Sequence, residues 1–528
     1  MKTSTKRATL AIALMAATSF ISPAMVAAKT LHISSAGDAG TTDPQAQAVS
    51  NTDQLLRQIY EGLLGRDKDL KLIPALATSW EAVEPDRWRF YLREGVTFHE
   101  GQPFTAEDVA FSLNRAAGPN SNFKNYTDTL KEVVVVDPLT VDVVTTGPDP
   151  ILPTKLYRIA MMSKPWAEEH GALEVTAQGT DGYAALNTNG TGPFVMVDRR
   201  PNVRTELTLN PDWWGEMDGN VTQYVSTPIS SPATRIAALL SGEVDMVMDP
   251  PLQDIPRIES NPAVTVATGP ENRTILLELD SGRDELLYSD VKGENPMAKV
   301  EVRKALYQAI DVDAIVSRIQ RGYAVPAGLQ IPPMVTGYSE EMDKRLPYDP
   351  EAAKALLAEA GYPDGFTLTL DCSNNRYPND EAVCQAISAM WTQIGVRTTL
   401  NAIPLQTFFP KVSAKDSSVF MLGIGSPTLD AYYSVQANLM TGTGDSADGL
   451  WSMAESIPEI IDLAIQARTE MDAEKRMDML VEAMKIAQDE VLYIPLYYPT
   501  GVWAMSAKVD ATFRADTVIE ARYVTIAD

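Results

Sequence analysis

Residues 88–112 combine a half-buried strand, a turn and a helix start in one continuous segment. The run WRFYLR at residues 88–93 alternates apolar side chains with polar or charged ones, which is the period-two pattern of a strand with one buried face. Gly101 and Pro103 then interrupt this pattern, because both residues favour turns. The segment is therefore predicted to form a β-turn-α unit.

The side chains after this turn mark where the helix begins. Thr105 is placed to cap the helix N-terminus, and Asp108, three residues later, completes a capping box. Phe104 and Val109 are spaced as a hydrophobic staple around that cap. The helix is therefore predicted to begin at Ala106.

Three more helices are marked in the second half of the chain. Asp349 is placed to cap one of them, and Gly361 closes it. A second helix is predicted from near Asn379 to Gly395, with apolar residues along one face, and an amphipathic pattern predicts a third over residues 470–489. We expect all three to pack against a hydrophobic core.

Strands and helices alternate along the 528 residues with no fixed-period repeat, which favours an α/β architecture built on more than one sheet. A single hydrophobic core rarely organises so long a chain, so two or more domains are expected. The apolar run VLYIPLYYP at residues 491–499 is broken by prolines. It is predicted to form a strand that crosses between lobes.

The first 28 residues have the pattern of a signal peptide. A basic start with Lys2, Lys6 and Arg7 precedes an apolar run, and small residues then predict cleavage between Ala28 and Lys29. The alternative, an uncleaved anchor, is disfavoured because the apolar run is shorter than the roughly 20 residues of a spanning helix. Since no cysteine precedes Cys372, there is no site for an N-terminal lipid, and a free periplasmic protein of a Gram-negative cell is expected.

The chain is strongly acidic. Without residues 1–28, 41 Lys and Arg face 70 Asp and Glu, a net charge of −29. Such a surface excludes nucleic acid as a partner. We interpret the acidic surface first as a feature that keeps the protein soluble, and recognition of a cationic cargo is the alternative.

The two cysteines of the chain, Cys372 and Cys384, lie close together in the sequence. In an oxidising compartment they are predicted to form a disulfide, with two free thiols as the alternative. His32, His99 and His170 are the only histidines, and none has ligand spacing to another or to a cysteine. No metal site and no cofactor are therefore predicted.

Longer phrases of the sequence resemble a known family. The phrase GVTFHEGQPFTAEDV at residues 95–109, after WRFYLR, closely resembles the signature region of the family 5 (cluster C) extracytoplasmic solute-binding proteins of ABC importers, the peptide and nickel type. Further segments resemble the family in the same order: TTDPQ (41–45), IYEGLL (59–64), PALATSWE (74–81), NGTGPF (189–194), LNPDWWG (209–215), LLSGEVD (239–245), VEVRKALYQAID (300–311) and YDPEAAKALLAEAGY (348–362).

The resemblance implies an α/β periplasmic binding protein of type II, cluster C. Such a protein has two lobes, a hinge between them, and a subdomain inserted in the first lobe. Carried onto this sequence, the first lobe takes residues 29–62, 189–270 and 495–528, the inserted subdomain takes residues 63–188, and the second lobe takes residues 271–494.

Arg376 is the first candidate ligand-binding residue. It lies in a polar loop before the predicted 379–395 helix, where a guanidinium can grip a carboxylate or a phosphate bidentately. The resemblance implies the same role, because an arginine before a helix that ends in Ile-Gly-Val holds the peptide carboxylate in the dipeptide-binding members. A solvated loop arginine is the alternative.

Asp430 is the second candidate. The resemblance implies an aspartate for the free amino end of a peptide at the position of Pro427, so that charge is missing here. Asp430, three residues later, is predicted either to replace it or to cap a turn. Recognition of a free peptide amine is therefore an open alternative.

The resemblance implies a monomeric receptor that captures peptides or peptide-like solutes and passes them to an inner-membrane permease pair with cytoplasmic ATPases. A non-peptide cargo (opine, sugar-phosphate conjugate, metal chelate or haem) is the alternative. A secreted hydrolase is a distant alternative, since the sequence lacks the HExxH, GxSxG and GxxxxGK[ST] motifs. We therefore expect no enzyme activity.

Overall fold

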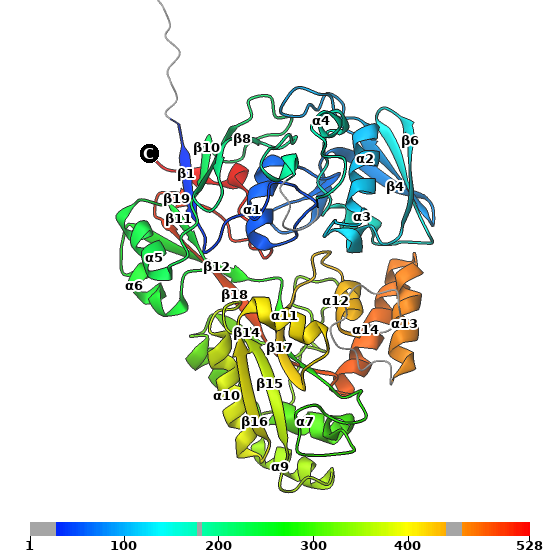
Figure 1. The fold of residues 1–528 in the computed structure, drawn as a ribbon, viewed down its shortest axis with the longest axis vertical. Coiled ribbons are helices and arrows are strands. Elements are labelled where there is room, and N and C mark those ends of the chain that lie inside the picture. Colours follow the sequence, from blue (N-terminus) through cyan, green and yellow to red (C-terminus); the bar gives the residue numbers. More distant parts are fainter. Residues whose placement is uncertain (1–27, 177–181, 440–456) are drawn as a thin grey trace, which may run out of the picture.

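A computed structural model describes residues 28–176, 182–439 and 457–528. The described chain forms two lobes, one above the other in Figure 1, and both the first strand and the C-terminus lie in the upper, first lobe. The predicted signal peptide lies outside the described residues except for Ala28. Within the described part of the chain, no helix is long and apolar enough to cross a membrane.

One 12-stranded sheet runs through both lobes, in the order β16-β15-β17-β13-β18-β11-β1-β10-β9-β8, with β12 and β14 also paired to β18. Its strands are β1 (Thr30–Ser34), β8 (Phe194–Arg200), β9 (Arg204–Leu209), β10 (Gln223–Ser226), β11 (Met246–Met248), β12 (Val264–Pro270), β13 (Thr274–Leu279), β14 (Ala324–Pro326), β15 (Thr367–Ser373), β16 (Arg397–Ile403), β17 (Val419–Ile424) and β18 (Tyr493–Ser506).

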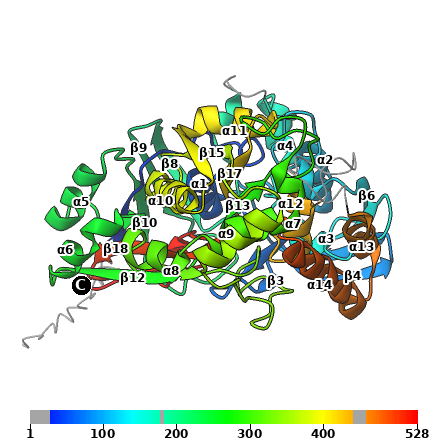
Figure 2. The same ribbon diagram turned by 90° about the horizontal axis from the view of Figure 1, so that it is seen from below.

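Strand β18 joins the lobes. Its first half pairs with β13 and β14 of the second lobe, and its second half pairs with β11 and β12 of the first. Since β12 and β13 follow each other in sequence, two antiparallel segments connect the lobes side by side (Figures 1 and 2). The prediction that residues 491–499 contain a strand crossing between lobes is confirmed.

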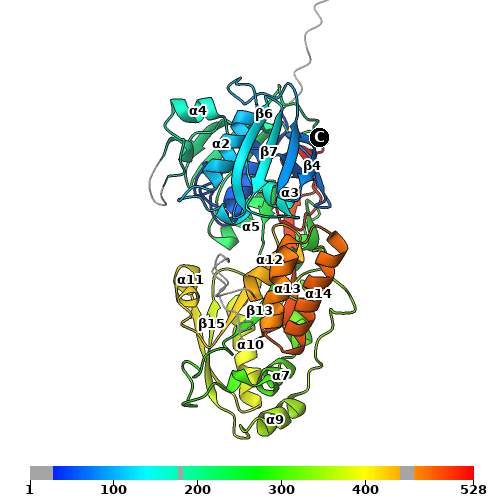
Figure 3. The same cartoon turned by 90° about the vertical axis from the view of Figure 1, so that its right-hand side faces the viewer.

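The region 63–188 carries its own antiparallel sheet, in the order β4-β5-β7-β6. Helix α2 lies across one face of this sheet (Figure 3) and contributes to the same core as β5 and β7. The elements here are β2 (Leu64–Arg66), β3 (Leu72–Pro74), β4 (Ala77–Glu84), β5 (Arg87–Leu92), α2 (Ala106–Ala116), β6 (Leu130–Asp137), β7 (Thr140–Thr145), α3 (Leu152–Leu156) and α4 (Lys164–Glu169).

The predicted β-turn-α unit is present. Phe90 and Leu92 are buried in β5, and α2 begins at Ala106. The Asp108 carboxylate accepts hydrogen bonds from the backbone N–H of Thr105 at 2.9 Å and from its hydroxyl at 3.0 Å. The capping box therefore forms as the sequence predicts.

Helices cover both faces of the second-lobe half of the large sheet. Alternate residues of β13 and β17 enter two different cores, so most residues of both strands are apolar. α7, α9 and α10 pack on one core, and α11 to α14 pack on the other. Their bounds are α7 (Val300–Gln308), α8 (Val312–Ala314), α9 (Pro350–Glu359), α10 (Asp380–Gln393), α11 (Leu405–Ser413), α12 (Ala431–Leu439), α13 (Pro458–Thr469) and α14 (Ala473–Asp489).

The predicted helices of the second lobe are confirmed as α9, α10 and α14. The Asp349 carboxylate accepts from the backbone N–H groups of Glu351 and Ala352, and Gly361 has the positive φ that ends such a helix. The first lobe is completed by α1 (Ser50–Ile59), α5 (Pro232–Ser241), α6 (Ile255–Glu259), β19 (Val509–Asp510) and β20 (Thr525–Ile526).

Cys372 and Cys384 form a disulfide, as predicted. Cys372 lies in β15 and Cys384 lies in α10, so the bond ties a central strand to the helix that covers it. Both residues are fully buried.

We expect that an alkylating reagent added to the unreduced protein in denaturant modifies neither cysteine, which mass spectrometry measures. The disulfide joins residues 12 apart, and on the loop-entropy model such a bond stabilises the fold by about 3 kcal/mol. Reduction under mild denaturation removes this constraint, so the melting temperature of the protein should fall. The variant with Cys372→Ala and Cys384→Ala is the control, since its melting must not respond to the reductant. Alkylation of both thiols without reduction would refute the bond.

Glu278 is a buried acid, next to the last residue of the fully buried strand β13. Burial raises the pKa of its carboxyl to about 8. The folded protein therefore keeps this proton up to about pH 8, whereas the unfolded chain loses it above the ordinary pKa of 4.5. Stability falls as the pH rises between these two values.

We therefore predict that the free energy of unfolding of Glu278→Gln, minus that of the natural protein, is larger at pH 8 than at pH 5. The difference should reach a few kcal/mol, because one pKa unit corresponds to about 1.4 kcal/mol. Denaturant melts at several pH values measure it. Glu341→Gln, at an exposed acid of the same lobe, is the control and should show no such trend. An unchanged difference between pH 5 and pH 8 contradicts the burial argument.

Candidate functional site

A cleft with a cavity volume of about 400 Å³ lies between the two lobes. Figure 3 shows α11 and α12 on the second-lobe side of this boundary, facing the first lobe. The lining comes from both lobes, as expected for a site that closes around a solute. It comprises Ala48, Ser50, Asp53, Arg158, Ala515, Asp516 and Thr517, and, from the second lobe, Glu271, Asn272, Arg273, Glu278, Arg376, Phe409, Leu422, Gly423, Ile424, Gly425, Pro427, Tyr433, Ala437 and Asn438.

The strand topology explains why the second-lobe residues meet here. β15 pairs in parallel with both β16 and β17, so the carboxyl ends of the three strands lie at one edge of the sheet. Arg376 follows β15, Phe409 lies in α11 after β16, and Pro427 follows β17. Ligands of open α/β sheets bind at the carboxyl ends of strands, and this edge faces the first lobe.

Arg376 lies in the cleft wall. Its guanidinium carbon lies 4.6 Å from the ring centre of Phe409 and 5.0 Å from that of Tyr377. Its backbone N–H donates to the Asp380 carboxylate at 3.0 Å, which holds the loop against the start of α10. Among the described residues, its buried Nη1 has no hydrogen-bond partner. Burial lowers the pKa of this guanidinium.

A second arginine, Arg273, lies close to Arg376. Its guanidinium forms an ion pair with Glu271 at 3.5 Å and lies 5.5 Å from the ring centre of Tyr377. The charge of Arg273 is therefore balanced within the protein. The aromatic ring of Tyr377 lies beside both guanidiniums and belongs to a hydrophobic core of the second lobe.

Asp430 is held by contacts inside the second lobe. Its two carboxylate oxygens accept from Arg476 at 2.7 and 2.8 Å, and one of them also accepts from the backbone N–H of Tyr432 at 2.9 Å. Asp430 directly precedes α12 and does not line the cleft. These contacts match the turn-cap alternative, so we leave Asp430 out of the proposed site.

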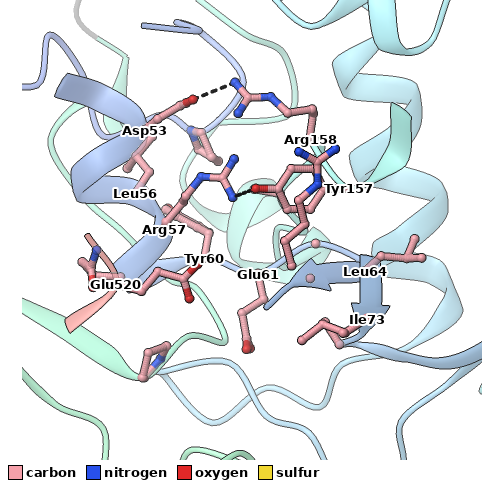
Figure 4. A pocket seen from close by; sticks show the side chains of 18 of the residues that line it. Asp53, Leu56, Arg57, Tyr60, Glu61, Leu64, Ile73, Tyr157, Arg158 and Glu520 are labelled. Carbon is pink, nitrogen blue, oxygen red and sulfur yellow. Dashed lines mark hydrogen bonds and ion pairs between the residues drawn. The ribbon is translucent and has the colours of Figure 1, made fainter. Parts of the chain in front are cut away.

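The first lobe contributes charged residues that the sequence did not single out. Arg158 forms an ion pair with Asp53 at 2.6 Å, drawn as a dashed line in Figure 4. Asp53 lies on α1 and Arg158 follows α3, about a hundred residues later. No local motif marks either residue, because only the tertiary fold brings the two segments together.

A smaller cavity of about 100 Å³ adjoins the cleft and shares Asp53 and Arg158 with it (Figure 4). Arg57, Arg66 and Tyr157 lie in its wall. Glu61 also lines it, and burial raises the pKa of that carboxyl to about 7. Glu61 accepts hydrogen bonds from the indole N–H groups of Trp213 and Trp214.

The histidines lie elsewhere. None of His32, His99 and His170 lines the cleft or the adjoining cavity. Within the described residues, no group of three His, Cys, Asp or Glu side chains is arranged to hold a metal ion.

Curated relatives match most of the chain. "Heme-binding protein A" of Haemophilus influenzae is 27% identical, over 86% of this chain and 84% of that protein. "Glutathione-binding protein GsiB" of Salmonella typhimurium is 25% identical, over 91% of this chain and 93% of that protein.

Solved structures share the fold. The periplasmic binding protein DppA of Helicobacter pylori in complex with the peptide STSA has a TM-score of 0.75 at 24% identity, covering 94% of this chain and 98% of that one. HbpA2 of Haemophilus parasuis has a TM-score of 0.78 at 24% identity, covering 94% of this chain and 99% of that one. The two-lobed α/β fold expected from the sequence is therefore confirmed.

The family model for the bacterial extracellular solute-binding proteins of family 5 matches residues 71–446. This match spans the inserted sheet, the hinge strands β12 and β13, and the loops that carry Arg376 and Pro427. The chain therefore belongs to family 5 of the bacterial extracellular solute-binding proteins.

Proposed function

We propose that this protein is the periplasmic substrate-binding component of an ABC importer, and that it captures a peptide or a peptide-like solute in the cleft between its lobes. The observation that carries the proposal is the Arg376 guanidinium in the cleft wall, which has a buried nitrogen without a partner among the described residues. A carboxylate of the cargo supplies that partner. The cargo is passed on chemically unchanged, so no enzyme activity is involved.

The physical chemistry of burial supports this role for Arg376. A charged solute enters a closed cleft only if its charge is paired there, because an unpaired buried charge is costly. A guanidinium offers two parallel N–H donors to a carboxylate, which adds geometric selectivity. The rings of Phe409 and Tyr377 beside the guanidinium limit its freedom, so less entropy is lost when a ligand binds.

The names of relatives support a small organic cargo. They include a glutathione-binding protein and structures bound to the peptide STSA and to the dipeptide Met-Leu. A second candidate is an acidic non-peptide solute, since one solved relative holds agropinic acid. The specific observation in its favour is Pro427, which leaves no carboxylate at the position implied for a peptide amine.

We propose the same domain division as the sequence indicates, with residues 63–188 as the insert and lobe boundaries near residues 270 and 495. The paired segments β12–β13 and β18 then serve as the hinge. The acidic, secreted protein acts as a monomer in the periplasm of a Gram-negative cell, without a lipid anchor, after cleavage behind Ala28. It delivers its cargo to an inner-membrane permease pair driven by cytoplasmic ATPases.

Arg376→Ala should weaken binding of the cargo by about tenfold or more, because it removes a charge-assisted hydrogen-bond pair. Isothermal titration with Met-Leu and with glutathione measures the affinity. The melting temperature of the ligand-free protein should stay nearly unchanged. Arg397→Ala is the control, at an exposed arginine that pairs with Asp290 away from the cleft. Equal affinities of the natural protein and Arg376→Ala remove Arg376 from the site.

Binding should also close the lobes. Since a ligand shifts a conformational equilibrium only by its greater affinity for one state, the closed form must make contacts that the open form lacks. We predict a smaller radius of gyration in small-angle X-ray scattering on addition of a binding peptide. A scattering curve that stays identical at saturation contradicts the hinged mechanism while leaving the binding site in place.

A further inference from the structure

Two arginines on the first-lobe side of the cleft lie on one aromatic ring. The guanidinium carbon of Arg57 lies 4.7 Å from the ring centre of Tyr157, and that of Arg66 lies 4.3 Å from it. Arg57 comes from the last turn of α1, whereas Arg66 ends β2. Figure 4 shows Arg57 pointing toward Tyr157, with its hydrogen bond to the tyrosine hydroxyl as a dashed line.

Neither arginine forms an ion pair with a carboxylate within the described part of the chain. Arg57 donates to the Tyr157 hydroxyl. Arg66 donates from Nη2 to the backbone carbonyl of Pro427, at 2.9 Å, across the boundary between the lobes. Both partners are neutral, so the two positive charges are not balanced by their direct contacts.

The nearby acids have other partners. Glu61, which lines the same cavity, accepts from the indole N–H groups of Trp213 and Trp214, and burial raises its pKa to about 7. Asp53 pairs with Arg158 at 2.6 Å. Asp516 accepts from Arg514 with both oxygens, at 3.2 and 2.9 Å. A third acid, Glu520, bridges Arg514 and Arg522 at 2.5 and 2.7 Å. The group of Arg57, Arg66 and Arg158 around Tyr157 therefore has more positive than negative charge.

Burial makes this excess costly. Arg66 is 4% exposed, and burial together with the repulsion of Arg57 and Arg158 lowers its pKa to about 10. A guanidinium without a counter-ion in such a place gains more from an anion than a solvated one does. The cavity beside it has room for a small group, about 100 Å³.

We propose that Arg57 and Arg66 form a second anion-binding subsite, and that the cargo is a peptide-like solute with two carboxylates, one bound here and one at Arg376. This inference rests on the proposed function, because a peptide-like cargo supplies carboxylates. Asp53 and Arg158 line both the cleft and the adjoining cavity, so the two spaces lie next to each other, and the proposed solute extends from one into the other.

The position of Pro427 agrees with this assignment. An acid at this position suits an ammonium group, but here the backbone carbonyl of Pro427 accepts from a guanidinium. The local charge is therefore positive. A solute that brings a carboxylate to this place is preferred over one that brings an amine alone, and its two anionic ends then connect the lobes.

The experiment compares peptides that differ by one carboxylate. Glutathione is paired with 4-aminobutyryl-cysteinyl-glycine, which lacks only the α-carboxylate of the γ-glutamyl residue, and Met-Glu is paired with Met-Gln. Isothermal titration of the full mature chain should give at least about tenfold tighter binding of the dicarboxylate in one pair or both. Arg57→Gln and Arg66→Gln should each reduce that preference to about threefold or less.

Matched variants separate charge from stability. Arg397→Gln is the control, because Arg397 is an exposed arginine that pairs with Asp290 at 2.8 Å, away from the cleft. It should keep the preference for the dicarboxylate. Arg57→Lys keeps the charge and should retain more of the preference than Arg57→Gln. Ligand-free melting curves identify any variant that fails to fold, and Arg57→Gln then replaces Arg66→Gln as the deciding variant.

The outcomes distinguish the two proposals. If both members of each pair bind equally, or if Arg57→Gln keeps the full preference, the second subsite is wrong, whereas loss of binding in Arg376→Ala still supports the proposed function. If none of the four peptides binds the natural protein, both the dicarboxylate cargo and the peptide-type function are overturned.

Discussion

The pairing of β18 with strands of both lobes is the interaction on which the site depends. β12 pairs with β18 from Val264 to Pro270, and β13 continues the ladder from Ile275, with a shift in register between Ile275 and Leu276. Hydrogen bonds on both sides of that shift keep the lobes adjacent. The register shift lies within the second-lobe half of the ladder, close to the point where β18 passes from β13 to β12, and an irregularity of this kind increases the local twist of a strand pair.

The same sheet fixes the chemistry of the cleft. Since β15, β16 and β17 run parallel, the loops after them must emerge at one edge, and that edge faces the first lobe across the hinge. Arg376 and Pro427 reach the cleft for this reason, although about fifty residues separate them. The disulfide between β15 and α10 holds the Arg376 loop, because Cys372 and Cys384 flank it. A fixed loop loses little entropy when a ligand binds.

Features that depend on neighbouring residues could be predicted from the sequence. The capping box of Thr105 and Asp108 and the cap at Asp349 involve residues within one turn of a helix, so the chain's spacing determines them. The disulfide was predictable because only two cysteines exist and the compartment is oxidising. Arg376 could be chosen because a polar loop between a strand and a helix places it at a sheet edge.

Features that depend on distant segments could not be predicted. The choice of Asp430 as a ligand group depended on whether another cation would take its charge, and Arg476, 46 residues later, does so. The roles of the first-lobe arginines could not be predicted either, because they also depend on contacts between distant segments. Arg57 and Arg66 are unremarkable in sequence, and their common neighbour Tyr157 lies about a hundred residues away. Only the folded chain shows that these cations share a ring and that, among the described residues, neither forms an ion pair with a carboxylate.

The overall charge of the protein makes this local arrangement selective. Without residues 1–28 the chain carries a net charge of −29, so its outer surface repels anions at long range. At physiological ionic strength that repulsion is screened beyond about 8 Å, whereas charges inside a cleft are screened much less. Arg57, Arg66 and Arg376 therefore act only on a solute that has already entered. An anionic cargo is then retained by buried guanidiniums rather than attracted by the surface, which favours solutes whose carboxylates fit both positions over anions in general.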